Sequence, residues 1–119
     1  MTTPAPSHVR VGPYALEVAV GGPAWDAQVE AHRSFHSPDD QLFGRCDFEN
    51  LIIGVNGDVA DDMIRETLLH EVLHACVFAS GADLGEGAEH EEAFVAVMSP
   101  MLIEVLRNNP VLVDFLLRR

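Results

Sequence analysis

Residues 66–75 read Glu-Thr-Leu-Leu-His-Glu-Val-Leu-His-Ala, and they shape the interpretation of the whole chain. Residues four apart on an α-helix lie one above the other, so His70 and His74 can present both imidazoles to one metal ion. Glu71 follows the first histidine and supplies a carboxylate that can take a proton from a nearby water. A hydrogen-bonded pair of core histidines is the simpler alternative, but the presence of Glu71 favours a metal site.

The surrounding sequence predicts a long helix. No proline or glycine occurs from 59 to 79, and Asp58 or Asp61 can accept the free amide hydrogens of the first turn. Gly81 is suited to end the helix in the left-handed conformation. Apolar residues also cover the side away from the histidines, which predicts a helix buried nearly all round: Leu69, Val72, Leu73 and Cys76.

A catalytic zinc site needs a third protein ligand and one position left for water. After the glycine-rich turn 81–87, a second helix is predicted from about 89 to 106, and it opens with Glu89-His90-Glu91-Glu92. Because the turn is short, we expect the two helices to be antiparallel neighbours, with this acidic turn lying over the first helix. The helix dipole alone also favours acidic residues there. Periodicity does not separate Glu91 from Glu92 as the ligand.

These motifs resemble the glutamate-ligand zincins, the thermolysin-like division of metallopeptidases. More narrowly, residues 42–110 look like the small single-domain zincin-like proteins of bacteriophages and actinobacterial genomes. The likeness lies in four segments: Gly44-Arg45-Cys46-Asp47 before an isoleucine-rich strand, Glu66 to Glu71 leading to His74, Glu91-Glu92 before Phe94-Val95, and Val105 to Pro110.

The resemblance implies a zinc-dependent enzyme that hydrolyses an amide bond of a peptide or protein. It implies Zn²⁺ bound by His70, His74 and Glu92, because the family ligand lies three residues before Val95, and it makes Glu71 the catalytic base. It assigns no donor for the oxyanion. Two alternatives remain: a non-peptidase amide hydrolase with the same site, and a non-catalytic structural or interaction protein in which zinc joins the two helices or is absent.

Composition limits the other function classes. A chain of 119 residues with 48% hydrophobic residues suits one globular domain, and a net charge of −12 argues against a nucleic-acid partner. That charge favours cations and basic peptides, although solubility explains it more simply. No segment is apolar enough to span a membrane, and Met1 to Pro13 lacks a signal core, which predicts a cytoplasmic protein. We therefore expect Cys46 and Cys76 to be buried reduced thiols.

The remaining sequence predicts an α+β scaffold. Residues 1–7 are expected to form a disordered tail, and 8–119 a single minimal zincin-like domain. Alternating apolar residues predict a small three-stranded sheet from 16–20, 42–48 and 51–55, packed against the metal-bearing helix and the second ligand helix. Further helices are expected at 24–36 and 111–117. The strand at 42–48 can hold an extended peptide by strand addition. The sequence does not determine the oligomeric state.

Overall fold

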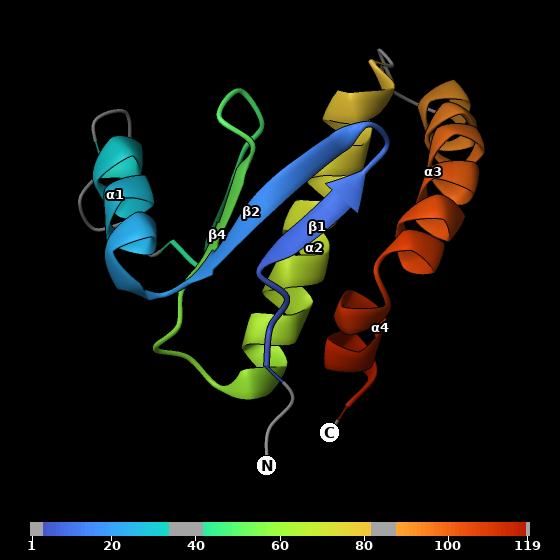
Figure 1. Ribbon diagram of the computed structural model, residues 1–119. Coiled ribbons are helices and arrows are strands. Elements are labelled where there is room, and N and C mark those ends of the chain that lie inside the picture. The colour runs from blue at the N-terminus through green and yellow to red at the C-terminus, as the bar shows by residue number, and fades with distance from the viewer. Residues whose placement is uncertain (1–3, 34–41, 82–87, 119) are drawn as a thin grey trace.

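The computed structural model describes residues 4–33, 42–81 and 88–118, with only the backbone described for 32–33, 88–92 and 95. It shows an α+β fold, as predicted (Figure 1). The elements in chain order are β1 (His8–Val11), β2 (Tyr14–Val20), α1 (Gly22–Arg33), β3 (Gly44–Asp47), β4 (Ile52–Val55), α2 (Asp61–Ser80), α3 (Ala88–Asn108) and α4 (Pro110–Leu117).

The sheet has four strands in the order β1-β2-β4-β3, rather than the three predicted. The additional strand is β1, which pairs antiparallel with β2 so that Val9 lies opposite Leu16. It is only four residues long, and the alternation of two valines with His8 and Arg10 is too short a pattern to predict a strand. Gly12, with φ of 58°, makes the tight turn that joins the pair.

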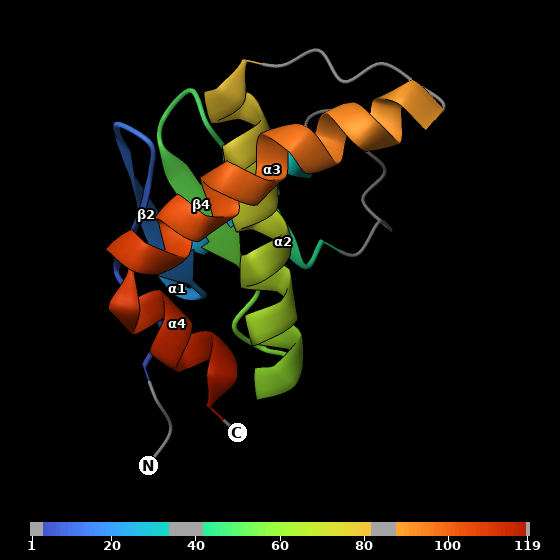
Figure 2. The same cartoon turned by 90° about the vertical axis from the view of Figure 1, so that its right-hand side faces the viewer.

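Helices cover both faces of the sheet (Figures 1 and 2). β2 and β4 pair in parallel, and β3 returns antiparallel to β4 at the edge of the sheet. Ile53 and Val55 of β4 are buried in the core with Leu68 and Val72 of α2. Gly54, between them, faces α1, where an added Cβ would lie 2.9 Å from the Trp25 ring. α2, α3 and α4 thus lie on one face and α1 on the other.

Residues 4–7 belong to the segment predicted as a disordered tail, and the structure describes them. Pro6 is buried, and Ala5 packs against the core. The backbone N–H of Val18 donates a hydrogen bond to the Ser7 carbonyl at 2.9 Å, which continues the pairing of β1 with β2. Residues 1–3 lie outside the described residues.

α2 agrees with its predicted extent but not with its predicted burial. It ends at Ser80, and Gly81 has φ of 66°, the left-handed conformation expected there. Ile64, Leu68 and Val72 lie in the core, but the opposite side faces solvent. The exposed residues of that side follow helical spacing: Met63, Glu66, His70, His74 and Phe78. The prediction of burial nearly all round was wrong because the histidine stripe is the solvent face of the helix.

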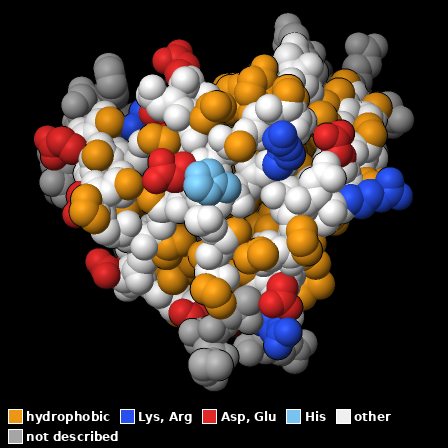
Figure 3. All heavy atoms as spheres, viewed as in Figure 1, with side chains coloured by type: hydrophobic (Ala, Val, Ile, Leu, Met, Phe, Trp, Pro, Cys, Tyr) orange, Lys and Arg blue, Asp and Glu red, His pale blue; other side chains and the backbone are white. Residues whose placement is uncertain are grey.

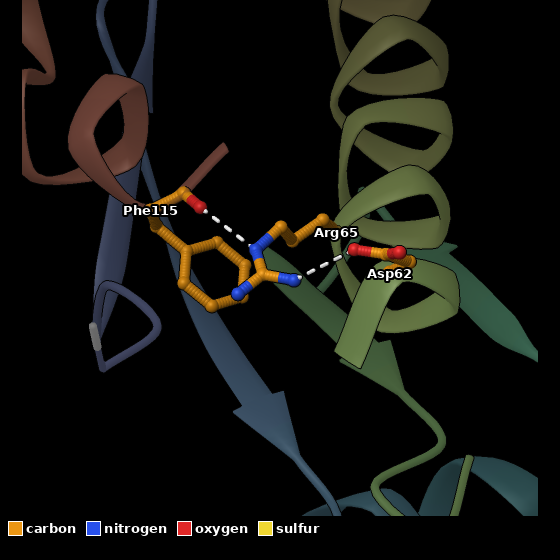
Figure 4. A network of polar contacts seen from close by, with 3 residues as sticks. All are labelled: Asp62, Arg65 and Phe115. Atoms are coloured by element: carbon orange, nitrogen blue, oxygen red, sulfur yellow. Dashed lines mark hydrogen bonds and ion pairs between the residues drawn. The ribbon is translucent and has the colours of Figure 1, made fainter. Parts of the chain in front are cut away.

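Arg65 joins α2 to α4 (Figure 4). Its Nε donates a hydrogen bond to the Phe115 carbonyl at 3.1 Å, and its Nη1 pairs with Asp62 at 3.0 Å. The guanidinium carbon also lies 5.6 Å from the centre of the Phe115 ring. The arginine therefore satisfies a carbonyl of α4 while its charge is held between a carboxylate and an aromatic ring.

α3 crosses α2 steeply, and its first turns extend past α2 (Figure 2). Met98 and Val105, further along α3, are the residues that join the core. The two helices are neighbours, as expected, but the steep crossing means that they are not aligned antiparallel and that the first turn of α3 does not lie over α2. Burial of the apolar residues of α3 sets this crossing, and the turn itself, residues 82–87, lies outside the described residues.

The buried amide of Asn109 fixes the junction of α3 and α4 to the sheet. Its Oδ1 accepts a hydrogen bond from the Arg10 backbone N–H at 2.8 Å. Its Nδ2 donates to the Arg10 carbonyl at 2.9 Å and to the Val105 carbonyl at 2.7 Å. One side chain thus pairs three backbone groups of β1 and α3.

We expect Asn109→Ala to lower the free energy of unfolding by about 2–3 kcal/mol, because it leaves those partly buried groups unpaired. Urea unfolding measures this. The neighbouring Asn108, at the exposed end of α3, is the matched control, and Asn108→Ala should change stability by less than about 0.5 kcal/mol. Equal effects of the two substitutions would contradict this role of Asn109.

Candidate functional site

His70 and His74 lie together on one stripe of α2, as predicted, and that stripe is the exposed face of the helix. Their Nε2 atoms are 3.1 Å apart, and the rings are inclined by 71° with centroids 4.8 Å apart. In the absence of a metal, one nitrogen must carry the hydrogen and the other accept it. Both nitrogens point to the same place in space, which is the arrangement that two ligands of one ion require.

The separation of these nitrogens fits zinc. Zinc lies about 2.0–2.1 Å from a histidine nitrogen, so two tetrahedral ligands are about 3.3 Å apart. The observed 3.1 Å differs from that by less than a small rotation of either ring would correct. His70 and His74 therefore fit as the two nitrogen ligands of a zinc ion.

Glu71 lies beside the histidine pair but is buried. Glu71 is only 7% exposed, and its carboxylate makes no hydrogen bond with any residue that the structure describes. Burial raises the pKa of its carboxyl above the usual value, and the charges of His74 and His70 partly oppose that shift. The carboxylate oxygens are not sealed from solvent, because no fully buried side-chain oxygen among the described residues lacks a hydrogen-bond partner. The carboxylate is therefore sheltered by its surroundings and still accessible to a water molecule.

The edge strand β3 lies directly against this part of α2. A Cβ added at Gly44 would lie 2.5 Å from the Thr67 methyl carbon and 2.9 Å from Oε2 of Glu71, closer than atoms pack. Glycine alone allows the strand to come this near. Since Glu71 is pressed between strand and helix, the contact explains why its carboxylate is buried.

The outer edge of β3 is free among the described residues. The Phe43 carbonyl accepts a hydrogen bond from the backbone N–H of Asn56 on the β4 side, at 2.8 Å. Antiparallel pairing alternates along a strand, so the backbone groups of Gly44 and Cys46 face away from β4. The free edge thus offers backbone donors and acceptors beside the histidine pair, in the part of the chain predicted to hold a peptide.

A cavity of about 310 Å³ opens next to the histidine pair. It lies between the start of β3 and the first half of α2, and Glu71 and His70 contribute to its wall. The remaining lining residues are Phe43, Gly44, Met63, Glu66 and Thr67. The sequence motif places the two histidines and Glu71, but it carries no signal for this cavity, because the cavity forms only where the strand meets the helix.

Both cysteines are free thiols. Burial raises the pKa of Cys46 to about 12, and the nearby Glu71 and Asp47 carboxylates add to the shift. Burial also raises the pKa of the Cys76 thiol, with a further contribution from Glu104. Both sulfurs are therefore protonated thiols near neutral pH in the metal-free protein.

The predicted third ligand, Glu92, and its rival Glu91 belong to the first turns of α3, but their side chains lie outside the described residues. Among the side chains that are described, no group of three His, Cys, Asp or Glu is placed to hold a metal ion. The structure thus brings together His70, His74 and Glu71, while the third ligand stays a prediction.

Searches against protein-family models, curated proteins and solved structures find no match to the chain. No helix in the described parts of the chain is both long and apolar enough to cross a membrane. The site is therefore interpreted from its own geometry.

We expect Gly44→Ala to destabilise the protein by about 1–3 kcal/mol, because the new methyl group overlaps the Thr67 side chain and the Glu71 carboxylate. Gly44 does not have a positive φ, so the cost is steric and not a backbone penalty. Thermal unfolding of the metal-free protein measures it. Combining the change with Thr67→Ser removes the closer overlap and should recover part of the loss. A Gly44→Ala variant as stable as the wild type would contradict the contact.

Proposed function

We propose that this protein is a zinc-dependent hydrolase that cleaves an amide bond of a peptide or protein. The observation that carries the proposal is the convergence of the His70 and His74 Nε2 atoms, 3.1 Å apart, beside a buried carboxylate that has no hydrogen-bond donor among the described residues. In this proposal His70, His74 and Glu92 hold the zinc, and the chain is a minimal zincin-like domain of the kind that its motifs resemble.

Zinc, when bound, lowers the pKa of a water to about 7 and polarises a carbonyl oxygen. The chain's own part in the reaction belongs to Glu71. One of its carboxylate oxygens takes the proton of the attacking water and returns it to the nitrogen of the leaving amine. Burial suits this role, because a carboxyl whose pKa is raised is a stronger base once it is ionised. Such proton transfer contributes roughly a hundred- to ten-thousandfold in rate.

The free edge of β3 supports a peptide as the substrate. An extended peptide paired with the outward backbone groups of Gly44 and Cys46 would run along α2 beside the histidines. Backbone pairing holds a chain of any sequence and places its amide bonds next to the site. The site would suit several kinds of amide hydrolase. We favour a peptidase, because only a peptide substrate would use the edge strand β3 as well as the histidine pair.

The open cavity beside Glu71 argues against the third possibility, a zinc ion that only joins helices. Structural zinc sites are closed by four protein ligands and need no adjoining space. Here about 310 Å³ of space borders both His70 and Glu71, enough to admit part of a substrate.

We expect the purified protein to hold about one zinc, and His74→Ala to remove it and lower the melting temperature, since bound ligand stabilises the fold. Glu71→Gln should keep the zinc and lose turnover, because the amide preserves shape but cannot accept the proton. Metal content is measured by plasma mass spectrometry, and turnover with quenched fluorescent peptides of mixed sequence.

His8→Ala is the matched control, since His8 is an exposed histidine of β1 and lies outside the site. It should change neither zinc content nor turnover. Unchanged zinc in His74→Ala would overturn the assignment of the ligands. Hydrolysis at the wild-type rate by Glu71→Gln would exclude Glu71 as the base.

The third ligand requires its own test. We expect Glu92→Ala to weaken zinc binding strongly, because two histidines alone leave the ion under-coordinated. Adjacent residues are about 100° apart around a helix, so Glu91 and Glu92 cannot aim equally well at one ion. Glu91→Ala should cost at most a few tenths to about 1 kcal/mol of stability through the helix dipole. Competition with a chelating dye compares the two variants.

Loss of zinc in Glu91→Ala together with retention in Glu92→Ala would reverse the assignment by one position. Retention in both single variants and in the double variant would remove this turn of α3 from the zinc site altogether.

A further inference from the structure

We propose that the cavity beside His70 binds an arginine or lysine side chain of the peptide substrate, and that Glu66 recognises its positive charge. This inference rests on the proposed peptidase function and names the class of peptide that the same site accepts. It is carried by the chemistry of the cavity wall, which combines apolar surface with two carboxylates and contains no arginine or lysine among its lining residues.

The apolar part of the wall suits the stem of a long side chain. Phe43 and Met63 are 38% and 39% exposed although both are large and hydrophobic, and the Thr67 methyl group lies near the floor beside Gly44. A volume of about 310 Å³ is at the lower end for ligand sites, which fits one side chain better than a whole small molecule. Arginine and lysine carry three or four methylene groups that bury well against such surface.

The polar part of the wall is negative. Glu66 is exposed on α2, and Glu71 contributes a second carboxylate that has no hydrogen-bond donor in the described part of the chain. The nearest arginines of α2 and β3 are directed elsewhere. Arg65 is bound to Asp62 and the Phe115 carbonyl, and Arg45 donates a hydrogen bond to Gln28 of α1. Neither of these arginines pairs with the cavity carboxylates, so a cationic side chain of a substrate would meet no competing guanidinium from α2 or β3 there.

The overall acidity of the protein does not by itself single out the cavity beside His70 as a binding site for a basic side chain. The face of the molecule in Figure 3 shows acidic side chains dispersed among apolar ones. The net charge of −12, with arginine as the only strongly basic residue type, would attract basic peptides to the molecule as a whole. Only the cavity adds a fitting apolar recess beside the proposed reaction centre.

The order of residues along α2 separates the cationic head of the substrate side chain from the proposed zinc ion. Glu66 precedes His70 by four residues and therefore lies one helical turn, about 5.4 Å, from it. A cationic head held at Glu66 points toward the beginning of α2, whereas an ion held by His70 and His74 lies toward its end. Glu71, between the two, reduces the repulsion that remains.

The test uses one extended peptide sequence made in four versions, with arginine, lysine, leucine or glutamate at a single position. Binding is measured by fluorescence anisotropy to metal-free wild-type protein, which keeps both Glu66 and Glu71 and has no zinc to support turnover, and hydrolysis is measured with zinc-loaded wild-type protein. The varied position is moved along the peptide in separate sets, so that every register on β3 is sampled. Leucine matches the apolar stem without the charge.

We expect arginine and lysine to exceed leucine by about three- to tenfold in binding at one register, and glutamate to bind weakest. Glu66→Gln should reduce the preference for arginine over leucine to below about twofold, and Glu66→Arg should reverse the order of arginine and glutamate. Glu17→Gln is the matched control, because it removes one exposed charge from β2 outside the cavity and should leave the preference unchanged.

Equal binding of arginine and leucine at every register, no binding of any peptide, or a preference that survives Glu66→Gln, would overturn the inference. Because binding is measured on metal-free protein and does not depend on turnover, these outcomes are separate from the failure of the proposed function. Arginine-selective binding without hydrolysis by the wild type would refute the peptidase and keep the cavity assignment. Hydrolysis without selectivity would do the reverse.

Discussion

The close approach of β3 to α2 at Gly44 is the constraint on which the rest of the site depends. An edge strand normally stands off a helix by the thickness of its side chains, but here the missing side chain brings backbone to within contact of Thr67 and Glu71. That contact buries the Glu71 carboxylate and raises the pKa of its carboxyl. It also leaves the outer edge of β3 beside the histidine pair, where the strand can take part in binding.

Neighbouring residues of α2 differ sharply in how far they are buried. Leu68 and Val72 are buried in the core, Glu71 is buried against the strand, and His70 and His74 face solvent. The three polar groups within one and a half turns of α2 thus have different surroundings, although they are neighbours in sequence. An exposed nitrogen pair can exchange an ion with solvent, while a sheltered carboxylate keeps a raised pKa. Both conditions suit metal-assisted hydrolysis better than a purely structural role.

Local patterns in the sequence predict much of this architecture. Gly81 marks the end of α2 because a left-handed residue is needed there, and alternation places β2, β3 and β4 within a few residues of their observed ends. The strand β1 was not predicted, because four residues give too short an alternation of apolar and polar side chains. The exposed face of α2 was missed because Leu69 and Leu73 are apolar yet only half-buried at its flanks. Nothing local indicates the Gly44 contact or the cavity, since both arise between residues of β3 and α2 that are about twenty or more positions apart.

The residues that hold the fold together are distinct from those that shape the site. Asn109 ties the junction of α3 and α4 to β1, and Arg65 ties α2 to α4, and neither lines the cavity beside His70. As a result, His70, His74 and Glu66 take no part in the described contacts that join the helices. The outer edge of β3 takes no part in them either. Substitutions of His70, His74 or Glu66 are therefore expected to test the proposed site without unfolding the protein, whereas Gly44 and Thr67 belong both to the packing of β3 on α2 and to the cavity wall.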